Sequence, residues 1–364
     1  MNCAVQQAES GASRLGKLVP VATCTTATPG LGLHCSFDSR GGVPMTATAE
    51  FNIHTIDTGF GGVQFDAAYL VVQAQHAALI DCGTSLSVPQ VLAAVQAAGL
   101  SPAQVEWLIL THVHLDHAGG AGALLRHLPN AQVLVHPRGA PHLIDPARLI
   151  AGATAVYGEA EMARNYGVIE PVPAERVVVA GEGHTVMLGE RALRTLETPG
   201  HARHHLCVWD ARSRSWFTGD TFGLSYRPLD SARGAFILPT SSPVQFEPEA
   251  MLQSIARLMD AAPEAMYLTH YGRVTSPEPL ARALGEQIHA MTDIALGCTQ
   301  RPDRHRCMVA ALTQLYLERA RQHECRLDDA AVERLLATDI ELNAQGLGCW
   351  LDRAARTGGN PPAH

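Results

Sequence analysis

The sequence contains no apolar run that approaches the roughly 20 residues needed to span a bilayer. It also lacks a basic surplus, because 27 Lys and Arg stand against 35 Asp and Glu, for a formal net charge of −8 at pH 7. Phosphate binding needs a basic surface, so this balance disfavours nucleic acid as a partner. We therefore expect neither a membrane nor a nucleic acid as a partner. We expect a small-molecule substrate instead.

Closely spaced cysteine pairs are missing as well. The nine cysteines occur singly, with no CxxC motif, in a chain of 364 residues that is long enough to bury a core without disulfides. The N-terminal stretch is a poor secretory signal, because its apolar segment is broken by Pro20, Pro29 and several glycines. We therefore expect free thiols and a cytoplasmic location.

The hydrophobic and charged fractions, 46% and 17%, are those of a globular protein with a sizeable core. Residues 1–45 are rich in Gly, Ser, Thr and Ala without a sustained hydrophobic period, which predicts a disordered or loose N-terminal extension. Residues 46–275 alternate short apolar strands with amphipathic helices and are predicted to form an α/β catalytic domain. Residues 276–364 have only helical periodicity, which predicts a helical C-terminal module that begins with Ser276 as cap and Pro277 in the first turn.

Apolar alternation and short buried runs locate the strands of the α/β part. They are expected at residues 68–75, 76–81, 105–110, 132–136, 176–179, 192–197, 205–209, 215–218 and 265–269. Helical spacing predicts helices over 89–98 and 119–128, and three amphipathic helices after residue 276.

The most informative segment is Leu110-Thr-His-Val-His-Leu-Asp-His-Ala-Gly-Gly120, in which three histidines and an aspartate occur directly after an apolar strand. His112 and His114 project to the same side of an extended segment, and Asp116 and His117 follow in the loop as an adjacent ligand set. Neutral imidazole and carboxylate together suit zinc, iron or manganese. The segment therefore predicts a metal site.

The pattern His-x-His-x-Asp-His resembles the signature of the metallo-β-lactamase superfamily. That family carries further ligands in a fixed order, and three segments match them in order: Thr198-Pro-Gly-His201, Phe217-Thr-Gly-Asp220 and Tyr267-Leu-Thr-His270. Asp81-Cys-Gly83 resembles the family's early Asp-x-Gly at a strand end. The resemblance covers roughly residues 51 to 275, and it implies a four-layer αββα sandwich followed by helices.

The resemblance also implies a site for two divalent ions, with zinc expected first and iron or manganese as alternatives. One ion would be held by His112, His114 and His201, the second by Asp116, His117 and His270, and Asp220 would bridge them. Two dications about 3.5–4 Å apart need a shared anionic ligand and activate a bridging hydroxide for hydrolysis. Asp116 and Asp220 are thus expected to act in catalysis as well as in metal binding.

Other polar residues near these motifs receive different interpretations. Asp81 is expected behind the ligands, where it orients a ligand histidine. His205 stands where many relatives repeat Gly-His and is expected to have a structural or orienting role. Tyr226 follows the bridging aspartate by a few residues, and it either reaches a substrate oxygen or is an ordinary loop tyrosine.

Departures from individual branches of the family narrow the prediction. True β-lactamases generally lack the bridging aspartate, and flavodiiron reductases usually place glutamate where this chain has His114. The complete ligand set resembles that of glyoxalase II, quorum-signal lactonases and persulfide dioxygenases. The leading prediction is therefore hydrolysis of an ester, thioester or lactone. A mononuclear-iron persulfide dioxygenase and a metal-retaining regulatory module without turnover stay open as alternatives, and a homodimer is the default assembly.

Overall fold

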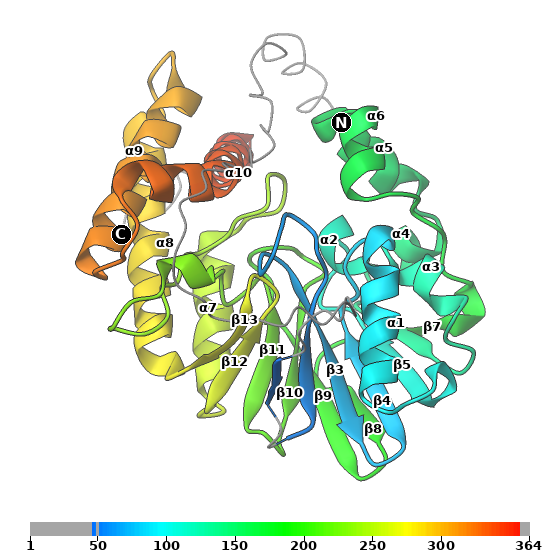
Figure 1. Cartoon of the computed structure of the whole chain (residues 1–364). Helices are drawn as coiled ribbons and strands as arrows, with labels where there is room; N and C mark the ends of the chain where they lie inside the picture. The colour runs from blue at the N-terminus through cyan, green and yellow to red at the C-terminus, as the bar shows by residue number, and fades with distance from the viewer. Residues whose placement is uncertain (1–45, 49–50, 357–364) are drawn as a thin grey trace, which may run out of the picture.

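The computed structural model describes residues 46–48 and 51–356, and two β-sheets lie face to face at its centre (Figure 1). The predicted N-terminal extension lies outside the described residues. The first sheet has its strands in chain order: β1 (Thr46–Thr48), β2 (Ile53–Asp57), β3 (Ala67–Gln73), β4 (His76–Ile80), β5 (Val105–Ile109), β6 (Gln132–Val135) and β7 (Val177–Val179).

Strands β4 to β7 run parallel to one another, so the segments that follow them emerge at one edge of the sheet. Apart from His76, Glu106 and Gln132, their side chains are apolar on both faces, because helices cover one face and the second sheet covers the other. This edge receives Asp81 after β4 and the histidine-rich segment after β5.

The second sheet has the order β13 (Gly272–Thr275), β12 (Ala265–Leu268), β11 (Ser215–Gly219), β10 (Leu206–Asp210), β9 (Arg191–Glu197) and β8 (Thr185–Leu188). All its pairings are antiparallel except that of β11 with β12. The two sheets are joined at several points. Ala67 N donates to Thr269 O at 2.8 Å, and the buried Arg191 pairs with Asp210 while also donating to Val72 O at 3.3 Å.

Helices flank the sandwich on both sides (Figure 1). The first sheet is covered by α1 (Val88–Ala97), α2 (Leu115–Ala118), α3 (Ala121–Leu125) and α4 (Ala140–Ile144), with α5 (Ala147–Tyr157) and α6 (Glu159–Asn165) beyond them. The second sheet is covered by α7 (Pro248–Met259) and α8 (Pro277–Cys298), and two further helices, α9 (Arg304–Gln322) and α10 (Asp329–Arg356), pack against α8 and against each other. Apolar side chains fill the space between the layers. The predicted αββα sandwich with C-terminal helices is confirmed.

The helical region after residue 275 shares its hydrophobic core with the second sheet. Phe222, Met266 and Leu268 belong to the same buried cluster as Leu284 of α8 and Leu347 of α10. The last strand does end at Thr275, next to the predicted boundary. The apolar packing nevertheless continues without a break across it.

Each predicted strand is present within two residues of its expected bounds, and α1 matches its prediction. Of the helix expected over 119–128, only residues 121–125 are helical, as α3, because the chain turns at Gly119 and Gly120 before it and again after Leu125. Backbone atoms within 2.5 Å of a built Cβ leave no room for a larger residue at either glycine. Strands β1, β2, β8 and β13 and helices α2 and α4 to α7 were not among the predicted elements.

Two further predictions need correction. Helix α8 begins at Pro277 as expected, but Ser276 makes no capping hydrogen bond, because its left-handed backbone (φ 55°, ψ 60°) is not the extended conformation of a cap. Free thiols were expected throughout, yet Cys298 and Cys307 form a disulfide across the turn from α8 to α9, which brings their Cα atoms to 6.0 Å. Among the described residues, no helix combines the length and apolar character that crossing a bilayer requires.

Candidate metal centre

The candidate ligands meet at one edge of the sandwich, and each sheet contributes part of them. The first sheet supplies four side chains from the segment between β5 and α3: His112, His114, Asp116 and His117. The second supplies three from the ends of its strands: His201 between β9 and β10, Asp220 after β11 and His270 after β12. Asp116 and His117 lie in the short helix α2 and not in a loop, because the chain starts to coil directly after His114.

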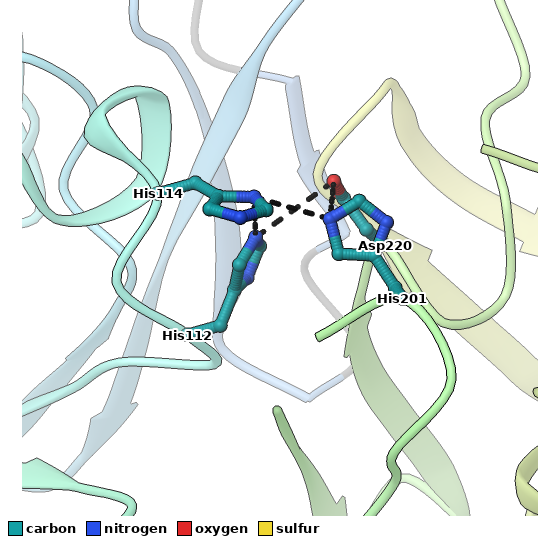
Figure 2. Close-up of side chains that lie close together, drawn as sticks. All are labelled: His112, His114, His201 and Asp220. Atoms are coloured by element: carbon teal, nitrogen blue, oxygen red, sulfur yellow. Dashed lines mark hydrogen bonds and ion pairs between the residues drawn. The ribbon is translucent and has the colours of Figure 1, made fainter. Parts of the chain in front are cut away.

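A first cluster brings together His112, His114, His201 and Asp220, whose side chains point toward one another (Figure 2). The His112 Nε2 atom lies 2.8 Å from His114 Nδ1, which in turn lies 3.1 Å from His201 Nε2. Asp220 Oδ2 is 3.2 Å from His201 Nε2 and 3.9 Å from His112 Nε2. Ligand atoms about 2.0–2.1 Å from one tetrahedral ion are spaced by similar distances, so this donor set fits a single metal ion.

A second cluster consists of Asp116, His117 and His270. His117 Nε2 and His270 Nε2 lie 3.7 Å and 3.5 Å from Asp116 Oδ2. The same two nitrogens lie 3.3 Å and 3.6 Å from Asp220 Oδ1. Asp220 thus faces one cluster with each carboxylate oxygen. Its Oδ1 and His117 Nε2 are buried without a hydrogen-bond partner among the described residues, which fits two atoms that ligate the same cation.

Hydrogen bonds hold the far side of most imidazole rings and so fix their orientation. Asp81 Oδ2 lies 2.9 Å from His117 Nδ1, and Asp81 Oδ1 accepts from Thr111 N at 2.8 Å. His270 Nδ1 donates to Phe65 O at 3.0 Å, and His201 Nδ1 lies 3.3 Å from Thr240 O. Asp81 therefore contacts the Nδ1 side of His117, and its role in orienting that ring stays a prediction.

His205 is buried next to the site, but its nitrogens face away from both clusters. Its Nε2 accepts from Asp220 N at 3.1 Å, and its Nδ1 lies 2.8 Å from Thr198 Oγ1. Gly219, at φ 48°, permits this close approach, because a Cβ there would lie 2.5 Å from His205 Nε2. His205 thus fixes the backbone of the residue that both clusters share.

Tyr226 is also buried. Its hydroxyl donates to Asp339 Oδ1 of α10 at 3.2 Å. This hydroxyl is the group that was expected to reach a substrate oxygen. The substrate role stays a prediction.

Burial and nearby charged groups determine the protonation states of the histidine and aspartate side chains in the two clusters. Burial lowers the pKa of His112 and His114, which favours the neutral imidazole that binds metals. Burial alone would raise the pKa of Asp220, but His117, His201 and His270 outweigh it and hold that pKa well below its usual value. Burial alone would lower the pKa of His270, but Asp220 and the other carboxylates raise it to about 10. His117 and His270 likewise outweigh burial and lower the pKa of Asp116, so both candidate carboxylate ligands are ionised.

Several residues of this neighbourhood were not predicted. Asp66 is fully buried with its Oδ1 3.9 Å from His270 Nδ1, and burial raises its pKa to about 7. The His204 ring lies 5.8 Å from the His114 ring, and burial lowers the pKa of His204 to about 4. Asp339 of α10 lies far away in sequence. His204 follows His201 by three residues, whereas no local motif marks Asp66 or Asp339, which only the folded chain brings to the site.

The sequence pattern of the metallo-beta-lactamase superfamily matches residues 61–270, which is more than half of the chain. The chain belongs to this superfamily. The matched range contains all seven candidate ligands. Divalent-metal binding is the property that the clusters and the superfamily jointly support.

Solved structures of the superfamily share the fold. The protein TTHA1429 from Thermus thermophilus superposes with a TM-score of 0.60 at 18% identity, over 85% of this chain and 97% of that one. ST1585 from Sulfolobus tokodaii gives a TM-score of 0.56 at 23% identity, over 82% and 98%. These likenesses show the architecture alone.

Among curated relatives, an acyl-coenzyme A thioesterase, MBLAC2 from Gallus gallus, is 29% identical over 171 residues, or 42% of this chain and 56% of its own length. A hydroxyacylglutathione hydrolase from Aeromonas hydrophila is 27% identical over 192 residues, or 53% and 56%. The matched part is thus little more than half of each relative. Both names are those of hydrolases, and neither similarity assigns an activity to this chain.

Proposed function

We propose that this protein is a two-metal hydrolase that cleaves a thioester. The observation that carries the two-metal part is the position of Asp220, whose Oδ2 faces the first cluster and whose Oδ1 faces the second. A carboxylate that serves a single ion has no need of a second set of imidazoles around its other oxygen. The arrangement supports two ions with Asp220 between them.

The donor set fits divalent zinc, iron or manganese, since it combines imidazole nitrogens with carboxylate oxygens and contains no thiolate. His112, His114 and His201 would hold one ion, and Asp116, His117 and His270 the other. When bound, such a pair supplies Lewis-acid activation of water and of the substrate carbonyl.

The exposure of the candidate ligands indicates the side from which a substrate reaches the site. Asp116 and His114 are partly exposed, whereas the other candidate ligands are buried. The substrate therefore approaches from the side of Asp116 and His114. On that side Asp116, 23% exposed, offers the carboxylate nearest to solvent as an acceptor for a proton from the attacking water.

The thioester is preferred over an oxygen ester or lactone because of the relatives. Two curated proteins with matching sequence are named for thioester substrates, an acyl-coenzyme A and a hydroxyacylglutathione. A third is named as an atrochrysone carboxyl ACP thioesterase from Aspergillus fumigatus, 28% identical over 118 residues. The acyl-carrying thiol differs among these names, and the thioester bond is what they share.

The test combines metal content with a matched substrate series. Elemental analysis of the full chain, expressed without added metal, should give close to two divalent ions per chain. Thioester, oxygen-ester and lactone substrates that carry the same acyl group are then compared by kcat/KM, and the thioester should be the fastest. A faster ester or lactone would overturn the substrate class. A single iron per chain, with oxygen uptake on a persulfide, would instead identify a dioxygenase.

A further inference from the structure

We propose that helix α10 positions two ligands of the metal centre. Its Asn343 positions His201, and its Asp339 positions His270. The two residues lie four apart, so they share one face of the helix. Both are buried, with 1% and 9% of their surfaces exposed. This inference rests on the proposed ligand set, and it gives the C-terminal helices a role that their sequence does not reveal.

Asn343 holds the segment that carries the His201 contacts. Its Oδ1 accepts from Ser241 N at 2.8 Å, and its Nδ2 donates to Pro239 O at 3.2 Å. The residues on either side of Ser241 bind His201: Thr240 O lies 3.3 Å from His201 Nδ1, and Ser242 Oγ donates to His201 O at 2.6 Å. Ring and backbone of this histidine are therefore both fixed by a segment that Asn343 anchors.

The helix lies so close to this segment that a side chain larger than glycine does not fit at residue 346. A Cβ on Gly346 would lie 2.2 Å from Ser241 Oγ and 3.0 Å from Ser242 O. Glycine inside a helix costs about 1 kcal/mol relative to alanine. The close contact explains the glycine here.

Asp339 acts on the other side of the centre through Tyr226. The Tyr226 hydroxyl donates to Asp339 Oδ1 at 3.2 Å, and the Tyr226 ring stacks on Phe65 with centroids 4.8 Å apart. Phe65 O accepts from His270 Nδ1, and Ser225 N, next to Tyr226, donates to His270 O at 2.5 Å. Ring and backbone of His270 are thus held by neighbours that Tyr226 contacts.

Because His201 belongs to the first cluster and His270 to the second, the two helix residues act on different ions. Removing a residue that orients a ligand typically lowers metal affinity 10-fold to 100-fold. Asn343→Ala should therefore weaken one of two metal-binding steps about 10-fold, and Asp339→Ala the other. The double variant should weaken both.

The experiment titrates Co²⁺ and Zn²⁺ into the metal-free full-length protein and follows binding by calorimetry and by the Co²⁺ absorption spectrum. Thr338→Ala, at an exposed position of the same helix, is the matched control and should bind both ions like the wild type. Gly346→Ala disturbs the same His201 contacts by displacing Ser241. It should weaken the same metal-binding step as Asn343→Ala does, although alanine is the better helix former. These readouts do not depend on turnover.

Variants that stay folded, as judged by circular dichroism, yet bind both ions with wild-type affinity and an unchanged Co²⁺ spectrum would overturn the inference. Equal weakening of both steps by each single variant would also overturn it, because that result indicates general loosening. If Asn343→Ala does not fold, Gly346→Ala decides. A wild-type protein that binds no metal would refute the proposed function itself, which separates the two failures.

Discussion

Asp220 offers a residue-scale test of the two-metal site, because each of its oxygens faces a different set of nitrogens. Replacing it with asparagine keeps the volume and removes the negative charge that two nearby dications require. We expect Asp220→Asn to retain its fold, to lose the second ion, and to keep less than about 1% of wild-type turnover. Asp293→Asn, at an exposed position of α8, is the control. Normal turnover in a variant with verified metal content would contradict the bridging role.

Asp339 leads to a prediction on pH. Burial raises its pKa from 3.8 to about 6, while His270 and the Tyr226 hydroxyl act in the opposite direction. The native carboxyl therefore binds more protons than the unfolded one between these two values, and its contribution to stability is lost as the pH rises through about 6. Asparagine does not titrate and still accepts from Tyr226.

The free energy of unfolding of Asp339→Asn, relative to wild type, should therefore increase between pH 4 and pH 7 by up to about 3 kcal/mol. Urea unfolding of the metal-free proteins at several pH values measures this difference. The metal-free form is needed because nearby dications would lower the pKa of the carboxyl. A difference that does not change with pH would show that Asp339 is already ionised at pH 4.

At the scale of elements, the disulfide joins the end of α8 to the start of α9 and closes a short loop. Cross-linking residues nine positions apart lowers the entropy of the unfolded chain and is worth about 2–3 kcal/mol. Cys298→Ser with Cys307→Ser should lose that much stability and leave metal content unchanged, since neither residue contacts the centre. Thermal unfolding with and without reductant measures it. An unchanged melting temperature would mean that the bond does not form in the protein.

The sequence predicts those elements whose signals are local. Strand β5 followed by His112 to His117 is a contiguous pattern, so the strand and its four candidate ligands could be identified together. His201, Asp220 and His270 were assigned only through the family resemblance, because nothing local relates them to β5. Asn343 and Asp339 could not be found at all. Their segment reads as an ordinary amphipathic helix, and only tertiary packing reveals which face meets the 239–242 segment.

At the scale of the whole molecule, the shared core between the second sheet and α8 to α10 bears on the predicted domain boundary. Deleting residues 276–364 would expose buried apolar surface on the second sheet, including Met266 and Leu268. We expect residues 46–275 alone to aggregate or to lack cooperative unfolding. Soluble expression with a sharp melting transition would show instead that the helices form an independent module.

Both candidate ion positions draw their ligands from the two sheets at once, so a bound ion is a cross-link between the halves of the sandwich. Metal loading and folding are then thermodynamically linked, and metal at 100 times its dissociation constant adds about 2.7 kcal/mol per site. Chelation should therefore lower the melting temperature and speed amide exchange, mainly where β5, β11 and β12 end. In such a protein, the concentration of available metal determines the free energy of unfolding as well as the activity.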